Sequence, residues 1–388
     1  MNILLVNFFL KANHGGILQC YALQKVLQDM GHTAVKAEPP RRILPKNKIR
    51  LLKTIIRKIW LRYIHRQKDI DVFSEIKSHM FRNIIDNNAH KFIRKHLKII
   101  KTDDFSNLKG SDYDAVIVGS DQLWRKSYIN IYPFTDKTPG DNMFLAFTRN
   151  WNCRRIAYAV SFGLDYWEYT PKETEKLKDL IHNFNAVSVR EDSGVQLIHD
   201  NLGEDINVCH VLDPALLLTK EDYVNLYKGI TLPPKEGKIL CYILDYNYTK
   251  QEIIDTVKKE TGEEAFYANN IDYAKPWLPW KKTIQTSIES WLKDFNDAKY
   301  VVADSFHACV FSIIFEKEFI VIANKQRGIA RIDSLLRMFN LENRIVFQKD
   351  DIQNISSTID WQSVREILQR ERKKSMSFLS SALKNTED

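Results

Sequence analysis

The sequence predicts an α/β fold with two Rossmann-like domains that face one cleft. Short apolar segments alternate with segments of helical periodicity over most of the chain, which is typical of parallel sheets covered by helices. Several apolar segments end in polar turns, and doubly wound sheets bind ligands at the carboxyl ends of their strands. The length of 388 residues exceeds one ordinary domain, so two domains are expected.

The composition is typical of a protein with packed cores and no membrane-spanning segment. Hydrophobic residues make up 44% of the chain, and no apolar run approaches the ~20 residues that span a bilayer. The chain begins directly with the apolar residues 3–6, so no secretory signal is expected. The five scattered cysteines predict neither a disulfide framework nor a zinc site. We therefore expect a cytoplasmic protein that binds no metal.

The first predicted unit, residues 2–35, is a strand, a polar turn, a helix and a second strand. The helix is expected from about Ile17 to Met30. Gly15 and Gly16 in the turn would let a ligand approach the backbone at the helix N-terminus. Taken alone, this turn is a weak signal for a ligand, and a purely structural role is the default interpretation.

The positive charge of the chain is concentrated in residues 41–68, which contain 11 Lys and Arg and no Asp or Glu. The rest of the chain has 46 basic and 49 acidic residues. Apolar residues recur in the basic segment at helical spacing: Leu52, Ile55, Ile56, Ile59, Trp60 and Tyr63. Such a helix suits an anionic membrane surface, which predicts a peripheral position on the inner face of the plasma membrane. The alternative is a helix packed on its domain. No nucleic-acid motif accompanies the charge, so no nucleic-acid partner is expected.

Three later apolar segments of the first half end in polar turns. The turns follow residues 114–118, 155–160 and 187–189, and their polar residues are Ser120, Asp121, Gln122, Ser161 and Arg190. Because each turn stands at the carboxyl end of a predicted strand, we expect these side chains near a ligand. Arg190 is followed by Glu191 and Asp192, so an ion-paired structural role is the alternative for this arginine.

The second half contains a strand, a polar turn, a helix and a strand, with a histidine in the turn. Residues 299–303 and 319–323 predict the strands, and Ser305 is expected to cap the helix between them. His307 lies in the turn, where the first N–H groups of the helix are available to an anion. The alternative for His307 is a packing role.

We predict a domain boundary near residue 230, where residues 233–237 read Pro-Pro-Lys-Glu-Gly. The N-terminal domain would be residues 1–230, with a basic helical insertion at about 41–110 whose later part is helical and then loop. The C-terminal domain would be residues 231–355 and carries His307. Residues 356–388 would form a helix that packs back on the N-terminal domain.

Five stretches resemble motifs of the polysaccharide pyruvyl transferase family, and together they span most of residues 1–350. They are residues 13–24 (Asn-His-Gly-Gly-Ile-Leu-Gln-Cys-Tyr-Ala-Leu-Gln), 119–124 (Gly-Ser-Asp-Gln-Leu-Trp), 188–193 (Ser-Val-Arg-Glu-Asp-Ser), 213–218 (Asp-Pro-Ala-Leu-Leu-Leu) and 304–307 (Asp-Ser-Phe-His). The resemblance implies a glycosyltransferase-B-like fold. It also implies transfer of pyruvate from phosphoenolpyruvate to two hydroxyl groups of a sugar, with release of phosphate and without a cofactor.

The resemblance also implies roles for individual residues. His307 is expected to protonate the methylene carbon of the donor, and Arg190, Ser305, Arg327 and Arg331 to bind the anionic groups of the donor. Asp121, Glu191 and Asp304 are the candidates for the base. The residues expected to bind acceptor or donor are Asn13, His14, Gly15, Gly16, Ser120, Asp121, Gln122 and Ser161. The acceptor would be a lipid-linked or nucleotide-linked sugar of a surface-polysaccharide precursor.

One departure and two other functions stay open. Many family members have an arginine close to the histidine; here Phe306 precedes His307, so Arg327 or Arg331 is expected to supply that charge. A glycosyltransferase with a nucleotide-sugar donor is the second hypothesis, with residues 268–280 stacking on the base. A membrane scaffold without catalysis is the third. Release of phosphate from phosphoenolpyruvate would distinguish the first hypothesis from the others.

Overall fold

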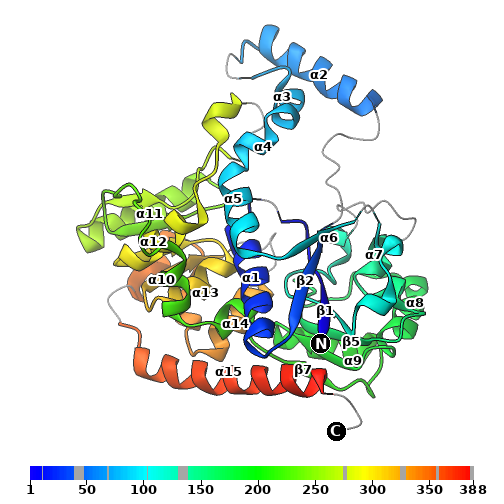
Figure 1. Cartoon of the computed structure of the whole chain (residues 1–388). Helices are drawn as coiled ribbons and strands as arrows, with labels where there is room; N and C mark the ends of the chain where they lie inside the picture. The colour runs from blue at the N-terminus through cyan, green and yellow to red at the C-terminus, as the bar shows by residue number, and fades with distance from the viewer. Residues whose placement is uncertain are drawn as a thin grey trace.

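A computed structural model of the chain has two parallel β-sheets and a projecting helical arm (Figure 1). The structure describes residues 1–10, 12–38, 48–67, 70–102, 104–129, 139–273, 278–323, 329–354 and 358–384. The strands in these ranges are β1 (Asn2–Val6), β2 (Thr33–Glu38), β3 (Ile99–Lys101), β4 (Ala115–Val118), β5 (Arg154–Val160), β6 (Ala186–Val189), β7 (Val208–His210), β8 (Ile239–Tyr242), β9 (Ala265–Tyr267), β10 (Tyr300–Ala303), β11 (Glu318–Ile322) and β12 (Ile345–Val346).

The first sheet has the strand order β3-β2-β1-β4-β5-β6-β7, and its recorded pairings are parallel. This is the Rossmann order, in which the direction of winding reverses between the first and the fourth strand. The reversal opens a crevice outside the carboxyl ends of β1 and β4. Asn7 and Gly119 are the first residues beyond these two strands.

The second sheet has the order β12-β11-β10-β8-β9, again with parallel pairings. Counted from β8, this is the flavodoxin-like order, whose winding reverses between its first and third strands, β8 and β10. The prediction of an α/β fold with two Rossmann-like sheets is therefore confirmed. The division of the chain into domains at residues 230 and 355 stays a prediction.

Helices cover both sheets. The α-helices in the described ranges are α1 (His14–Asp29), α2 (Lys48–Tyr63), α3 (Ser74–Met80), α4 (Arg82–Ile85), α5 (Asn87–His96), α6 (Lys126–Ile129), α7 (Pro139–Asn142), α8 (Pro171–Ile181), α9 (Asp192–Asn201), α10 (Lys220–Tyr227), α11 (Tyr248–Thr261), α12 (Ile288–Asp297), α13 (Phe306–Ile314), α14 (Ala330–Met338) and α15 (Trp361–Leu383). Short 3-10 helices include η4 (Pro214–Leu217) and η5 (Trp280–Thr283).

Two sequence predictions about elements were wrong. The first helix begins at His14 and not near Ile17, because Asn13 is its N-cap and accepts a hydrogen bond from the amide of Gly16 (3.4 Å). Gly15 and Gly16 therefore belong to the first turn of α1. The end of the inserted segment, expected as loop, contains the edge strand β3, which pairs with β2.

The strands at the centre of both sheets are buried on both faces. Every residue of β4, β8 and β10 is buried, as expected for parallel strands covered by helices. One apolar cluster contains residues from both sheets, among them Leu5 of β1 and Val301 of β10. The two sheets are therefore joined by a packed apolar interface that includes α1 and α13.

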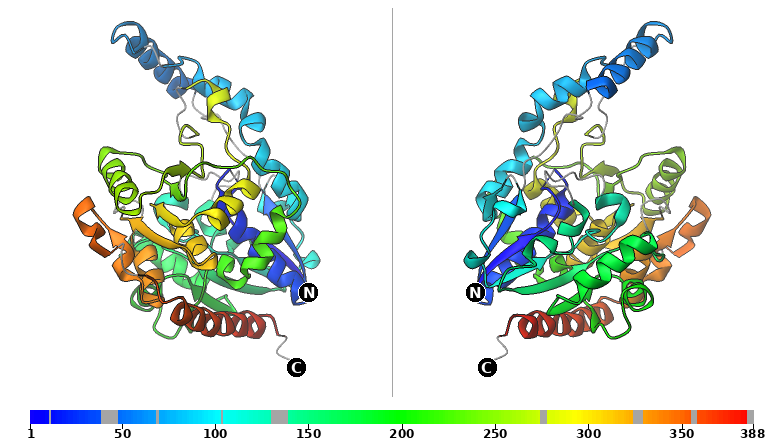
Figure 2. Two further views of the ribbon diagram at one scale, coloured as in Figure 1. Left: turned by 90° about the vertical axis from the view of Figure 1, so that its left-hand side faces the viewer. Right: turned by 90° about the vertical axis from the view of Figure 1, so that its right-hand side faces the viewer.

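The last helix, α15, runs along the lower side of the molecule and connects both halves (Figures 1 and 2). Near its start Arg365 forms an ion pair with Glu316, which follows α13 (3.0 Å). Further along, the amide of Leu212 donates to the Ser375 hydroxyl (3.0 Å), and Arg154 of β5 donates to the carbonyl of Ala382 (2.7 Å).

The segment from α2 to α5 forms an arm that projects from the two sheets (Figures 1 and 2). Its base contacts the second half of the chain: Phe81 stacks on Trp280 with ring centres 4.5 Å apart, and Asn88 donates to the carbonyl of Gln285 (2.8 Å). α2 lies at the far end of the arm. None of the helices in the described ranges has the length and hydropathy needed to cross a membrane.

Candidate active site

A pocket of about 180 Å³ lies where the reversal points of the two sheets face each other. Residues that follow β1 and β4 line one side, and residues that follow β8 and β10 line the other. The lining residues are Asn7, Phe8, Phe9, Leu10, Asn13, Gly16, Ile17, Gln19, Asp121, Gln122, Tyr128, Leu244, Asp304, Ser305, Phe306, His307, Arg331 and Ile332. The carboxyl ends of strands from both sheets therefore meet at one cavity, as ligand sites of doubly wound folds do.

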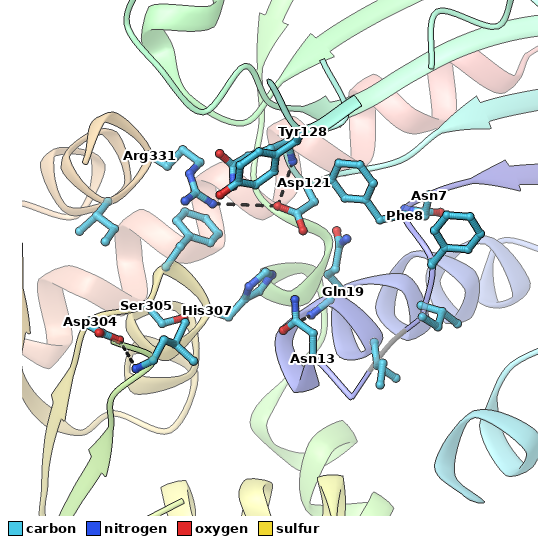
Figure 3. A pocket seen from close by; sticks show the side chains of 18 residues that line it. Asn7, Phe8, Asn13, Gln19, Asp121, Tyr128, Asp304, Ser305, His307 and Arg331 are labelled. Carbon is cyan, nitrogen blue, oxygen red and sulfur yellow. Dashed lines mark hydrogen bonds and ion pairs between the residues drawn. The ribbon is translucent and has the colours of Figure 1, made fainter. Parts of the chain in front are cut away.

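His307 lies in the first turn of α13 and points into this pocket (Figure 3). Its Nε2 is 4.0 Å from a carboxylate oxygen of Asp213 and has no hydrogen-bond partner among the residues that the structure describes. The ring packs against Gly15 of α1: a Cβ atom added at Gly15 would lie 2.3 Å from Cγ of His307. Gly15 therefore allows the two helices to approach closely enough to place this imidazole in the pocket.

The pKa of His307 is lowered from its ordinary value. Burial is the main cause; Asp213 and Asp121 oppose it, and the positive charges of Arg190 and Arg331 add to it. The imidazole is therefore neutral near pH 7 in the unliganded protein. A bound anion would add negative charge beside the ring and raise its pKa, so that ligand binding favours the proton-donating form.

Arg190 contacts the pocket-lining residues Asp121 and Phe306 and belongs to a network of buried polar groups. It donates to Asp213 (2.8 Å) and to Asp121 (3.3 Å), and its guanidinium lies 4.2 Å from the ring centre of Phe306. Ser120 donates to the same oxygen of Asp213 (2.9 Å). Arg190 thus pairs with Asp121 and Asp213, which are distant from it in the sequence, rather than with the acids that follow it directly. Its side chain is 1% exposed and does not line the pocket, and its link to the pocket is the bond to Asp121.

Asp121 is the acid of this network that reaches the pocket. Its backbone has φ of +87°, an unusual value for a residue with a side chain, and such strain concentrates at functional sites. Burial would raise the pKa of the Asp121 carboxyl, but Arg190, His307 and Arg331 together lower it below its usual value. Asp121 is therefore a carboxylate near neutral pH, with 15% of its side chain exposed.

Arg331, in the first turn of α14, is the pocket-lining arginine in the described part of the chain. Its guanidinium is 4.0 Å from Asp121 and 5.8 Å from the ring centre of Phe306. Burial and the charge of Arg190 lower the pKa of Arg331 to about 10, so it keeps its charge at neutral pH. Arg327, the other predicted replacement for the missing cation, lies outside the described residues.

Two candidates for the base have structural roles. The Asp304 carboxylate accepts hydrogen bonds from the amides of Leu244 (2.8 Å) and Asp245 (3.1 Å) and from Lys250 (2.6 Å). One oxygen of Glu191 accepts from Ser161 and from the amides of residues 162 and 163. Both carboxylates are buried and hold loops in place. Their geometry therefore does not support the expectation that Asp304 or Glu191 is the base.

Two other predicted site residues, His14 and Ser161, also have structural roles. His14 is buried, stacks on Trp291 and donates from Nε2 to the carbonyl of Thr286 (3.0 Å). Ser161 is buried beside Glu191 and does not line the pocket. Ser305 is the N-cap residue of α13, but its side chain makes no capping hydrogen bond, so that part of the prediction was wrong.

The missing cap leaves the first N–H groups of α13 without a partner from Ser305, at the wall of the pocket. The first turn of α1 lies across the pocket, with Asn13, Gly16 and Ile17 in the lining. Two helix N-termini and Arg331 therefore surround the space in front of His307 (Figure 3). Such an arrangement favours an anionic ligand.

Sequence reasoning missed several residues of the site. Asp213 was noted within a motif but given no role, although it contacts both Arg190 and His307. Gln19 and Tyr128 also line the pocket. Gln19 is buried in α1, and its amide donates to the carbonyl of Ser120 (3.2 Å). The signal available for Gln19 in the sequence was its place within residues 13–24, the stretch that resembles a family motif.

A sequence model of the family described as polysaccharide pyruvyl transferase matches residues 13–326. No curated protein sequence matches the chain.

Several solved structures resemble this one over nearly their whole length. MurG from Acinetobacter baumannii is 8% identical, with a TM-score of 0.44 and coverage of 98% of each chain. A UDP-GlcNAc 2-epimerase from Neisseria meningitidis is 10% identical, with a TM-score of 0.48 and coverage of 99% of each chain. A UDP-N-acetylglucosamine 2-epimerase from Rickettsia bellii is 10% identical, with a TM-score of 0.45 and coverage of 98% of this chain and 96% of its own.

Proposed function

This chain belongs to the polysaccharide pyruvyl transferase family, and from that premise we propose that it forms a pyruvate ketal on a sugar of a surface-polysaccharide precursor. The donor is phosphoenolpyruvate, and inorganic phosphate is released. The acceptor is a lipid-linked or nucleotide-linked sugar. The observation that carries the proposal is His307, a buried imidazole at the N-terminus of α13 in a pocket bordered by Arg331 and a second helix N-terminus.

The donor site follows from charge. Phosphoenolpyruvate carries a phosphate and a carboxylate, and an arginine binds either group with two parallel hydrogen bonds. Arg331 is the pocket-lining cation for one group, and the first amides of α13 suit the other. Arg190 adds positive charge and holds Asp121 and Asp213 in place.

The chemistry begins with proton transfer. The bound anions raise the pKa of His307, and the imidazolium then gives its proton to the methylene carbon of the donor. That carbon becomes a methyl group, and positive charge develops on the neighbouring carbon that bears phosphate and carboxylate. Asp213, 4.0 Å from His307, stabilises the protonated ring before the transfer.

Two additions complete the ketal. One sugar hydroxyl attacks the electron-poor carbon and loses its proton, and Asp121 is the carboxylate placed to accept it. The bond from carbon to the phosphate oxygen then breaks, and phosphate leaves with its electron pair. The proton held by Asp121 leaves with phosphate. The second hydroxyl attacks the same carbon, gives its proton to the neutral imidazole of His307, and closes the ring. Asn13 and Gln122, on the opposite side of the pocket, are the amides available to orient the hydroxyl groups.

The test is turnover by the purified protein with phosphoenolpyruvate and a panel of lipid-linked and nucleotide-linked sugars. We expect phosphate release that depends on the sugar, together with a product whose mass exceeds the sugar by pyruvate less one water. Release of a nucleoside diphosphate from a nucleotide sugar, without consumption of phosphoenolpyruvate, would instead establish a glycosyltransferase. The glycosyltransferase alternative needs an aromatic residue of 268–280 to stack on the nucleotide base. In the described part of this segment, Trp280 already stacks on Phe81.

Replacement of His307 tests the proposed acid. His307→Ala should lower turnover by roughly 10²–10⁴-fold, the usual contribution of a positioned acid, with unchanged thermal unfolding. His182→Ala is the matched control, because His182 is an exposed histidine that does not line the pocket. Near-normal turnover of a folded His307→Ala protein would reject this role.

A further inference from the structure

We propose that the outer face of α2 is a docking surface for an anionic lipid bilayer. This inference goes beyond the reaction, because it concerns a surface at the far end of the arm and does not depend on what the pocket binds (Figures 1 and 2). It rests on three observations: exposed apolar side chains, the basic residues beside them, and contacts that fix which side of α2 faces outward.

The apolar residues of α2 are exposed to a degree unusual for large side chains. Trp60 is 48% exposed, Ile56 57% and Tyr63 70%. They lie on one side of the helix, at spacings of three, four and seven residues. The full set of exposed apolar residues in this helix is Ile49, Leu52, Ile56, Ile59, Trp60 and Tyr63. A continuous apolar stripe of this kind normally marks an interaction surface.

The inner side of α2 is held by the rest of the arm. Lys58 donates to the hydroxyl of Ser74 at the start of α3, and Arg62 donates to the carbonyl of Ile70 (2.5 Å). Ile55, on this side, is only partly exposed. These contacts orient α2 so that its apolar stripe faces away from the protein, which differs from the alternative of a helix packed on its domain.

Basic side chains border the apolar stripe. Lys53 and Arg57 are exposed and stand one helical turn apart, next to Ile56 and Trp60. The segment 41–68 around them has 11 Lys and Arg and no Asp or Glu. Apolar residues with Trp and Tyr, bordered by basic residues, are the composition of helices that lie in the headgroup region of an anionic bilayer.

Charge also argues for lipid over a second copy of this chain. Two copies joined through α2 would bring two segments together that each carry 11 basic and no acidic residues, which repel each other. An anionic bilayer offers the opposite charge and an apolar interior for the stripe. A lipid bilayer offers phosphate groups to the basic side chains and an apolar interior to the stripe. Free phosphate would account for the basic side chains alone.

The experiment is co-sedimentation of the full chain with vesicles of phosphatidylcholine alone and of phosphatidylcholine with phosphatidylglycerol. We expect sedimentation with the anionic vesicles only, and release as salt screens the attraction. Lys53→Glu with Arg57→Glu should lower the partition coefficient about ten-fold or more, because both reversed charges would lie at the surface. Ile56→Ser with Trp60→Ser should weaken binding at every salt concentration.

The matched control is Lys259→Glu with Lys373→Glu, which changes the net charge equally at exposed sites of α11 and α15. This variant should sediment like the unchanged protein. The proposal is overturned if the unchanged protein ignores anionic vesicles at low salt, if the control variant loses binding equally, or if α2 variants change only the oligomeric state in solution. Turnover on a water-soluble acceptor should be unaffected by the α2 variants, so failure of this proposal is distinguishable from failure of the enzymatic one.

Discussion

Gly15 illustrates how one missing side chain positions the proposed acid. It lies in α1, where alanine would favour the helix by roughly 0.5–1 kcal/mol over glycine. A Cβ atom there would nevertheless lie 2.3 Å from Cγ and 2.5 Å from Cβ of His307. Because Cβ of His307 is bonded to the backbone of α13 and Cγ to Cβ, these atoms cannot move far without displacing the helix. Relief of the clash must therefore shift the imidazole.

We therefore expect Gly15→Ala to remain folded and to lose turnover by about ten-fold or more, since small displacements of a catalytic group are costly. Turnover and thermal unfolding of the variant provide the measurement. Gly31→Ala is not a suitable control, because Gly31 has φ of +86°. Gly194→Ala is better, since Gly194 lies in helix α9, does not line the pocket, and has the Val189 side chain as its nearest neighbour at 3.1 Å. Unchanged turnover of Gly15→Ala would mean that the position of His307 is not critical.

At the residue scale, the sequence predicted which polar residues follow the strands better than it predicted what each of them does. His307 and Asp121 were identified because they follow predicted strands, and both line the pocket. Asp304 and Glu191 also follow strands, yet their carboxylates point back to backbone amides. Periodicity places a side chain at the end of a strand, but its direction depends on partners such as Lys250 that are distant in sequence.

At the scale of elements, the pair Asp304–Lys250 ties the end of β10 to α11. Both side chains are buried, and their charged atoms are 2.6 Å apart. Asp304→Ala leaves the Lys250 ammonium buried without its counter-ion and should lower the free energy of unfolding by about 3–5 kcal/mol. The double variant Asp304→Ala, Lys250→Met should recover part of this loss, because the unpaired charge is gone. Denaturant unfolding of the three proteins measures the difference.

This experiment also separates structure from catalysis at Asp304. If Asp304 were the base, its replacement would abolish turnover while stability stayed near that of the unchanged protein. We expect the reverse order of effects, with a large loss of stability. Equal stability of Asp304→Ala and the unchanged protein would contradict the structural role.

The elements that the sequence predicted poorly are the short ones. β3 has three residues and pairs with β2 at the sheet edge, and β12 has two and pairs with β11. Such segments are too short to show periodicity, and only the neighbouring strand makes them strands. The start of α1 was misplaced because glycines usually signal a turn, whereas here the cap at Asn13 and close packing allow them in a helix.

At the scale of the whole molecule, the alternation of strands and helices was enough to predict two Rossmann-like sheets. It did not predict the strand orders, because these depend on which crossovers pass over which face of the sheet. The reversals between β1 and β4 and between β8 and β10 decide where the pocket lies. Asn7 and Leu244 line the pocket for this reason alone, and no local pattern identified them.

The contact between α1 and the second half of the chain should respond to pH through His14. His14 is fully buried, stacked on Trp291 with ring centres 5.7 Å apart and bonded to the Thr286 carbonyl. Burial lowers its pKa from 6.5 to about 4, which the Thr286 bond partly opposes. The unfolded chain therefore binds a proton near pH 6.5 that the folded chain takes up only near pH 4, so acidification through this range favours unfolding.

The size of this contribution is about 3 kcal/mol between pH 7.5 and pH 4, from the difference between the two pKa values. His14→Gln should be less stable than the unchanged protein at pH 7.5, because the stacking on Trp291 is lost. Its disadvantage should shrink by about this amount as the pH falls to 4, because the variant has no proton to take up there. His182→Gln is the control with the opposite sign: the Lys178 carbonyl raises the pKa of His182, so removing that histidine should reduce stability slightly more at acid pH. Urea unfolding at both pH values measures the free energy of unfolding of each protein. If His14→Gln and the unchanged protein differ in this free energy by the same amount at pH 7.5 and at pH 4, protonation of His14 does not cause the loss of stability at acid pH.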